Sequence, residues 1–141
     1  MKYLFIALFS LTPIFIFSQS EKEKVYILFN ETSKETCNKE DGSGNFLIIK
    51  MYKKESKGKR MNFHICNETF IYTEGKSEKD TCNIKILKKS RLKNLDYLLK
   101  KYNESEDFKH HVFEKIYIVE KISNEKSIKY EVYWSGEWTI E

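Results

Sequence analysis

An uncharged apolar segment near the N-terminus limits how much of this chain can belong to a folded domain. Residues 3–17, YLFIALFSLTPIFIF, follow the positive charge of Lys2. A basic residue before an apolar run is typical of a secretory signal peptide. The run holds about 15 residues, fewer than the roughly 20 that an α-helix needs to cross a membrane. We therefore expect residues 1–18 to be a cleaved signal peptide.

The residues after the apolar run indicate where cleavage occurs. Ser18, Gln19 and Ser20 precede a charged run at 21–24, and small side chains favour cleavage after Ser18, which could extend to Ser20. The alternative is an uncleaved anchor or a buried N-terminal helix. Cleavage predicts a chain that is exported, periplasmic or extracellular, and not stably inserted in a membrane.

The remaining residues, 19–141, predict a single globular domain. Roughly 120 residues support one hydrophobic core but not two. Hydrophobic residues make up 40% of the chain and aromatic residues 15%, more than a disordered chain carries. We expect this domain to fold on its own.

A lysine-rich stretch is the densest basic segment of the sequence. It contains Lys53, Lys54, Lys57, Lys59 and Arg60. Such a stretch can meet a nucleic acid, an anionic glycan or an acidic protein. The formal net charge of the whole chain is only +4, so we interpret the stretch as a solvated hairpin turn and expect no nucleic-acid partner.

Short runs of β-branched and aromatic residues between polar turns predict the strands. These runs are residues 25–29, 46–52, 61–66, 69–73, 83–87, 112–122 and 127–134. The runs on either side of Gly58 predict one hairpin, and the last two runs predict another around Asn124 and Glu125. Residues 32–45 and 74–81 are polar and predict loops.

One segment has the spacing of an amphipathic helix. Its apolar residues recur three and four positions apart, and they are Leu92, Leu95, Leu98, Leu99 and Tyr102. Ser90 is the predicted N-cap. The sequence therefore predicts an α+β fold with a mostly antiparallel sheet of about six to seven strands and this helix packed on one face.

The last strand alternates between apolar and polar residues. Its predicted core face holds Ile128, Tyr130, Val132 and Trp134, while Tyr133 belongs to the other face. Exposed aromatic residues bind sugar rings and protein partners. We predict a recognition surface made by Tyr133, Trp134 and Trp138.

Three cysteines allow three disulfide pairings. Cys37, Cys66 and Cys82 would in an oxidising compartment form one bond and leave one thiol over. We favour Cys66 with Cys82, which would tie the ends of a short strand pair and stabilise the fold by about 3 kcal/mol. The third cysteine would be buried or would pair with a second chain.

No set of residues has the spacing of a known catalytic or metal site. His110, His111 and Glu114 lie together, and His64 lies two residues before Cys66, but neither arrangement matches the spacing of zinc ligands. We expect no metal and no cofactor.

These observations favour a small exported, non-catalytic binding protein, similar in role to an inhibitor or an immunity protein, whose partner is another protein. One alternative is a small secreted hydrolase that uses Cys66 or a histidine such as His111. Another alternative is a glycan-binding module associated with the cell envelope.

Overall fold

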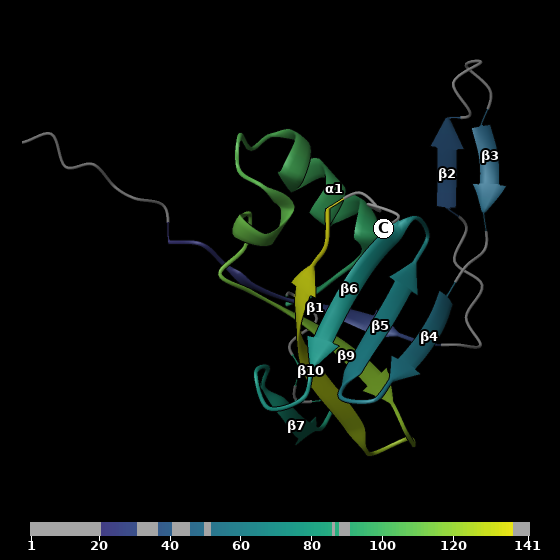
Figure 1. Ribbon diagram of the computed structural model, residues 1–141, viewed down its shortest axis with the longest axis vertical. Coiled ribbons are helices and arrows are strands. Elements are labelled where there is room, and N and C mark those ends of the chain that lie inside the picture. The colour runs from purple at the N-terminus through teal and green to yellow at the C-terminus, as the bar shows by residue number, and fades with distance from the viewer. Residues whose placement is uncertain are drawn as a thin grey trace, which may run out of the picture.

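A computed structural model gives the fold (Figure 1) and describes residues 21–30, 37–40, 46–49, 52–85, 87 and 91–136. For residues 37–40, 46–49 and 52 only the backbone is described. The predicted signal peptide, its cleavage site and Trp138 lie outside the described residues. None of the helices within the described ranges is long and apolar enough to cross a membrane.

The described residues form ten strands, one α-helix and one short 3₁₀ helix. In chain order these are β1 (Lys24–Phe29), β2 (Cys37–Glu40), β3 (Phe46–Ile49), β4 (Tyr52–Lys57), β5 (Arg60–Ile65), β6 (Glu68–Thr73), β7 (Lys79–Cys82), β8 (Leu92–Lys93), α1 (Leu95–Asn103), η1 (Lys109–His111), β9 (Lys115–Lys121) and β10 (Ser127–Trp134).

The main sheet contains eight strands and is mixed. Its order is β4-β5-β6-β10-β9-β1-β8, with β7 also paired to β10, while β2 and β3 form a separate two-stranded sheet. β1 runs parallel to both β9 and β8, and the other pairs of the main sheet are antiparallel. The prediction of a mostly antiparallel sheet is therefore wrong. Hairpin signals are local, whereas the parallel pairing of β1 joins segments about 90 residues apart in the sequence.

β10 holds the sheet together along both of its edges. One edge pairs with β9 through residues 127–132. The other edge pairs with β7 through residues 127–130 and then with β6 through Tyr133 and Trp134. The backbone N–H of Glu131 donates to the carbonyl of Glu78 at 2.8 Å, between those two segments. Residues 127–131 of β10 are thus flanked on both sides, whereas Tyr133 and Trp134 pair with β6 alone.

The main sheet curls so that strands far apart in its order face each other. Phe29 of β1 and Phe63 of β5 have ring centroids 5.2 Å apart, and Lys54 of β4 donates to Glu120 of β9 at 2.6 Å. Neither pair comes from neighbouring strands. Figure 1 shows β4, β5 and β6 crossing in front of β1 and β9. The concave inner face therefore encloses the core.

The core is made by alternate residues of the strands, as period-two side-chain direction requires. Its buried side chains are Val25, Ile27, Phe29, Phe63, Ile65, Phe70, Tyr72, Ile116, Ile118, Tyr130, Val132 and Trp134, joined by Leu95 and Leu98 of α1 and by Phe113. The predicted core face of the last strand is confirmed, with Ile128 partly buried against the same cluster. The helix packs on this inner face.

A smaller apolar cluster covers part of the outer face. Tyr26, Tyr117 and Val119 are buried there, and Cys82, Ile84, Leu87 and Leu92 pack against them. The rings of Tyr26 and Tyr117 are stacked, with centroids 5.0 Å apart. This cover explains why three successive residues of β1 are buried, since a strand shielded on both faces loses the alternating pattern.

A partly buried ion pair attaches η1 to the inner face of the sheet. Lys109 donates to Glu68 of β6 at 2.8 Å, and each side chain is only 14% exposed. The indole N–H of Trp134 donates to the same carboxylate at 2.7 Å. The Lys109 ammonium also lies over the rings of Tyr102 and Trp134, at 5.4 and 5.6 Å from their centroids. These contacts fix the segment between α1 and β9.

The helix begins later than predicted. Asn94 is its N-cap and accepts a hydrogen bond from the backbone N–H of Tyr97 at 3.0 Å. Leu92 instead belongs to β8 and pairs with Tyr26. The prediction of Ser90 as the cap was wrong, because the leucine spacing continues across the boundary while the capping side chain decides where the helix starts.

The strand predicted at residues 83–87 is replaced by a turn. The side chain of Asn83 accepts from the backbone N–H of Lys85 at 2.9 Å, and the N–H of Leu87 donates to the carbonyl of Asn83 at 3.3 Å. Such side-chain hydrogen bonds compete with strand pairing. The strand lies at β7 instead, within the segment predicted to be a loop, because β10 offers a free edge to its backbone.

The hairpin predicted around Gly58 is confirmed, and Gly58 has the positive φ of 58° that suits glycine in a tight turn. The run at 46–52 pairs with two partners, since β3 pairs with β2 and β4 pairs with β5, and its residues 50 and 51 lie outside the described residues. The polar segment 32–45, predicted to be a loop, contributes β2. The hairpin of residues 112–134 around Asn124 and Glu125 is present as β9 and β10.

The ion pair of Glu68 predicts a measurable stability effect. Glu68→Gln leaves Lys109 partly buried without a carboxylate, and we expect the free energy of unfolding to fall by about 2 kcal/mol. Urea unfolding followed by circular dichroism measures the change. The control is Glu104→Gln, whose exposed pairs with Lys100 and Lys101 are worth at most about 0.5 kcal/mol. Equal losses in both variants would contradict this role of Glu68.

Candidate functional site

Three aromatic rings lie against one another on the surface next to the end of β10. We call Phe108, His110 and Tyr133 the aromatic surface. The rings of Phe108 and His110 are nearly parallel with centroids 5.9 Å apart, and those of His110 and Tyr133 are 4.9 Å apart. Phe108 is 75% exposed and Tyr133 is 49% exposed. They form a continuous stack that remains open to solvent.

The local structure explains why these rings meet. The backbone N–H of His111 donates to the carbonyl of Phe108 at 2.8 Å, which closes the short turn of η1. Lys109 is drawn inward to Glu68, so its neighbours Phe108 and His110 lie on the solvent side of the turn. Tyr133 lies on the outer face of β10, between the buried Val132 and Trp134.

A cavity of about 250 Å³ adjoins the aromatic surface. His110 and Tyr133 belong to its lining together with Glu114, Lys115 and Glu131. The lining therefore combines aromatic and charged residues. Such a combination fixes the orientation of an apolar group by contacts at its polar end.

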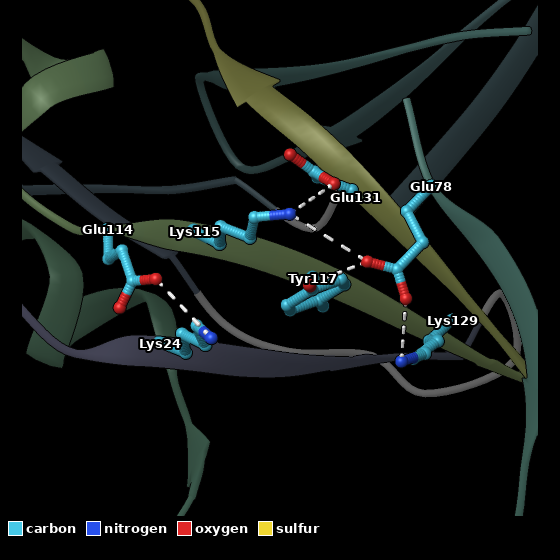
Figure 2. Close-up of polar contacts among 7 residues, drawn as sticks. All are labelled: Lys24, Glu78, Glu114, Lys115, Tyr117, Lys129 and Glu131. Carbon is cyan, nitrogen blue, oxygen red and sulfur yellow. Dashed lines mark hydrogen bonds and ion pairs between the residues drawn. The ribbon is translucent and has the colours of Figure 1, made fainter. Parts of the chain in front are cut away.

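The charged residues next to the cavity are paired with one another on the outer face of the sheet (Figure 2). Lys115 contacts Glu131 at 3.0 Å and Glu78 at 3.8 Å, and Lys129 contacts Glu78 at 3.0 Å. The hydroxyl of Tyr117 donates to Glu78 at 3.0 Å.

At the edge of the same face Lys24 pairs with Glu114 at 3.3 Å. Three ammonium groups therefore balance three carboxylates.

Glu78 is the centre of this network, and the pKa values follow from it. Hydrogen bonds from Lys129 and then from Tyr117 lower the pKa of Glu78. The bond to Glu78 raises the pKa of Lys129, and the bond to Glu131 raises the pKa of Lys115. Burial and the bond to Glu78 raise the pKa of Tyr117 to about 12. Each group is held in its usual charge state at neutral pH, so the network is a fixed support for the site.

The three predicted binding residues have different positions. Tyr133 is exposed and belongs to the aromatic surface. Trp134 is instead a core residue with 0% exposure, stacked on Phe70 and bonded to Glu68, and it contributes to the lining of the cavity. Trp138 lies outside the described residues.

The predicted disulfide between Cys66 and Cys82 is not formed, since Cys82 is a free and partly buried thiol. Cys82 ends β7 opposite Ser127 of β10, whereas Cys66 lies in the turn between β5 and β6. The sequence suggested that both cysteines flank one short strand pair. That argument failed because β6 and β7 both pair with β10 rather than with each other.

The three histidines lie on two elements of the fold, β5 and η1. His64 is buried on β5, with its ring nitrogens 3.2 Å from the hydroxyl of Thr69 and 3.3 Å from Glu55. His110 and His111 lie in η1 with ring centroids 4.0 Å apart. Among the described residues, no group of three or more histidines, cysteines and carboxylates is placed to hold a metal ion.

Sequence reasoning did not identify Phe108, and it considered His110 only as a candidate for metal binding or catalysis and not as part of a recognition surface. Neither belongs to a periodic apolar pattern, and Phe108 lies in a charged segment after the helix. A large aromatic residue isolated between charged residues was the available signal, since such a residue is rarely needed by a core.

Comparison of the chain with protein-family models, with curated proteins and with solved structures finds no match.

The network around Glu78 predicts a specific acid dependence of stability. A carboxyl whose pKa is lowered by folding stabilises the protein above its unfolded pKa, and this contribution is lost as the pH falls through the folded value. We therefore expect Glu78→Gln to lose less free energy of unfolding than the wild type when the pH is reduced from about 7 to about 3. Urea unfolding at both pH values measures the loss.

The matched control is Glu125→Gln, in the exposed turn between β9 and β10. This variant should lose as much stability on acidification as the wild type does. Identical losses in the wild type and in Glu78→Gln would show that Glu78 is not held by these contacts in solution.

Proposed function

We propose that this chain is an exported, non-catalytic binding protein of the inhibitor or immunity type, and that it recognises another protein through the aromatic surface. The observation that carries the proposal is the exposed stack of Phe108, His110 and Tyr133 beside a small cavity. Aromatic side chains supply a large share of the binding energy at protein interfaces. Leaving such rings in water is unfavourable, so their covering by a partner releases free energy.

The size of the cavity supports a protein partner over a free small molecule. Pockets for drug-sized ligands usually have about 300–1,000 Å³, whereas this cavity has about 250 Å³. A space of this size suits one inserted side chain. The surrounding aromatic rings would then pack against the residues on either side of it.

The charged side chains around the cavity are paired with one another, which favours an uncharged group on the partner. Lys115, Lys129 and Lys24 are paired with Glu131, Glu78 and Glu114, so these groups together present no excess charge to a partner at the aromatic surface. Paired charges at the rim of an interface contribute orientation more than affinity. An apolar or aromatic side chain of the partner is the group that fits best.

Site-specific photo-crosslinking tests the surface directly. A photoreactive phenylalanine analogue at position 133 should form one dominant adduct with another protein in the cells that produce this chain. The matched control places the same analogue at Ile122, which is exposed in the turn at the other end of β9 and should give no such adduct. Adding Phe108→Ala to the reporter at 133 should lower the yield about tenfold, as loss of an interfacial aromatic contact does.

Two results would count against this function. Equal adducts at positions 133 and 122 would show that contact is not confined to the aromatic surface. No adduct at 133, together with weaker retention of Tyr133→Ala on a polysaccharide matrix, would favour the glycan-binding alternative, because sugar rings also stack on exposed aromatic residues.

The proposed export has its own test. Removal of residues 1–18 would start the mature chain at Gln19 in an oxidising compartment. Because Cys82 is a free thiol, the remaining pairing within the chain is Cys37 with Cys66. Intact mass measured on secreted protein should show loss of the first 18 to 20 residues, with one alkylated cysteine before reduction and three after reduction.

Peptide mapping of the same sample should place the single alkylated cysteine at position 82. Retention of the N-terminus, or three reactive thiols in freshly isolated protein, would contradict export to an oxidising compartment.

A further inference from the structure

A second cavity lies on the outer face of the sheet, away from the aromatic surface. Its volume is about 530 Å³, within the range of about 300–1,000 Å³ that is usual for small-molecule pockets. It lies between β7, the first half of β10 and the segment that leads to β8. We call it the Cys82 pocket.

The strand register places the groups of this pocket. Asp80 pairs with Lys129 and Cys82 pairs with Ser127 across β7 and β10, so Asp80, Cys82 and Lys129 share the outer face. All three line the pocket. Tyr26 of β1 also lines the pocket, and in the strand order β1 is separated from β10 only by β9.

The pocket has an apolar part and a cationic part. Tyr26 and Leu87 provide apolar surface, and the ring of Tyr26 is held parallel to that of Tyr117. Arg91 and Lys129 provide two positive charges against the single carboxylate of Asp80.

Lys129 is shared with Glu78, which does not line the pocket, whereas Arg91 makes no ion pair with any carboxylate that the structure describes.

We propose that the Cys82 pocket binds a small aromatic carboxylate. The ring of the ligand packs against Tyr26 and Leu87, and its carboxylate accepts hydrogen bonds from the guanidinium of Arg91, whose planar donors match a carboxylate in two-point geometry. Lys129 adds a second positive charge. An inorganic anion alone would leave the apolar part of the pocket unfilled.

Cys82 lines the pocket, so the rate at which its thiol is modified measures whether a reagent binds there. Burial raises the pKa of Cys82 above its ordinary value of 9.0, so its reaction with a freely diffusing reagent is slow at neutral pH. A reagent that binds in the pocket before it reacts will therefore modify Cys82 faster than a reagent that does not bind there.

The test uses dithiobis(nitrobenzoate), an aromatic carboxylate disulfide, and dithiodipyridine, a neutral aromatic disulfide. In both reactions the thiol of Cys82 loses its proton to solvent, its sulfur attacks one sulfur of the reagent, and the other aromatic thiolate leaves with the electron pair. Peptide mass mapping follows the modification of Cys82 separately from the other cysteines.

We expect the rate with dithiobis(nitrobenzoate) to saturate as its concentration rises. Benzoate should slow that reaction, while its neutral analogue benzamide should not. Arg91→Gln should lower the rate about tenfold, as loss of a charge-assisted contact does, and should leave the rate with dithiodipyridine almost unchanged. The control Arg60→Gln, at the start of β5, should behave as the wild type.

Several results would overturn the proposal. A rate that rises linearly with dithiobis(nitrobenzoate) and is not slowed by benzoate would exclude binding before reaction. If inorganic phosphate slowed the reaction as much as benzoate does, the aromatic ring would not contribute to binding, and a preference for an aromatic ligand would be wrong. An unchanged rate with dithiobis(nitrobenzoate) in Arg91→Gln would show that Arg91 does not bind the carboxylate. The comparison of benzoate with benzamide uses the wild-type protein, so it does not depend on the folding of a variant.

Discussion

The ion pair between Lys109 and Glu68, shared with the indole of Trp134, is the contact on which the candidate site depends. It joins η1 to β6 and β10 at the end of the core, where all three side chains are mostly buried. Because Lys109 is drawn inward, Phe108 and His110 are left on the solvent side and meet Tyr133. An unpaired ammonium in this place would be costly, which makes the position of the turn well determined.

β10 connects the two outer-face regions that we assign to binding. Its last residues carry Tyr133 of the aromatic surface, and its first half carries Lys129 of the Cys82 pocket. Between them Glu131 and the network around Glu78 use paired charges to cover the outer face. Residues 127–131 of β10 are flanked on both edges, which makes this part of the strand a rigid support for the groups that it carries.

The sequence predicted individual strands and hairpins more successfully than the pairing of strands that lie far apart in the chain. The first strand, the hairpin at Gly58 and the final hairpin follow from alternating patterns and turn residues, which act over a few positions. The parallel pairs of β1 and the polar strand β7 were missed because they depend on an edge provided by distant residues. For the site, Tyr133 could be found from its place on the polar face and Phe108 from its isolation between charged residues, but the contact of both rings with His110 could not.

The sequence alone determined the α+β composition, the apolar face of the last strand and the presence of an exposed aromatic residue at Tyr133, because these follow from side-chain type and from the two-residue period of a strand. The tertiary structure decided that Cys82 is a free thiol and that Tyr133 is joined by His110 and Phe108. Those outcomes arise from contacts between segments far apart in the chain, and a pattern read along one segment carries no information about which distant surface it will meet.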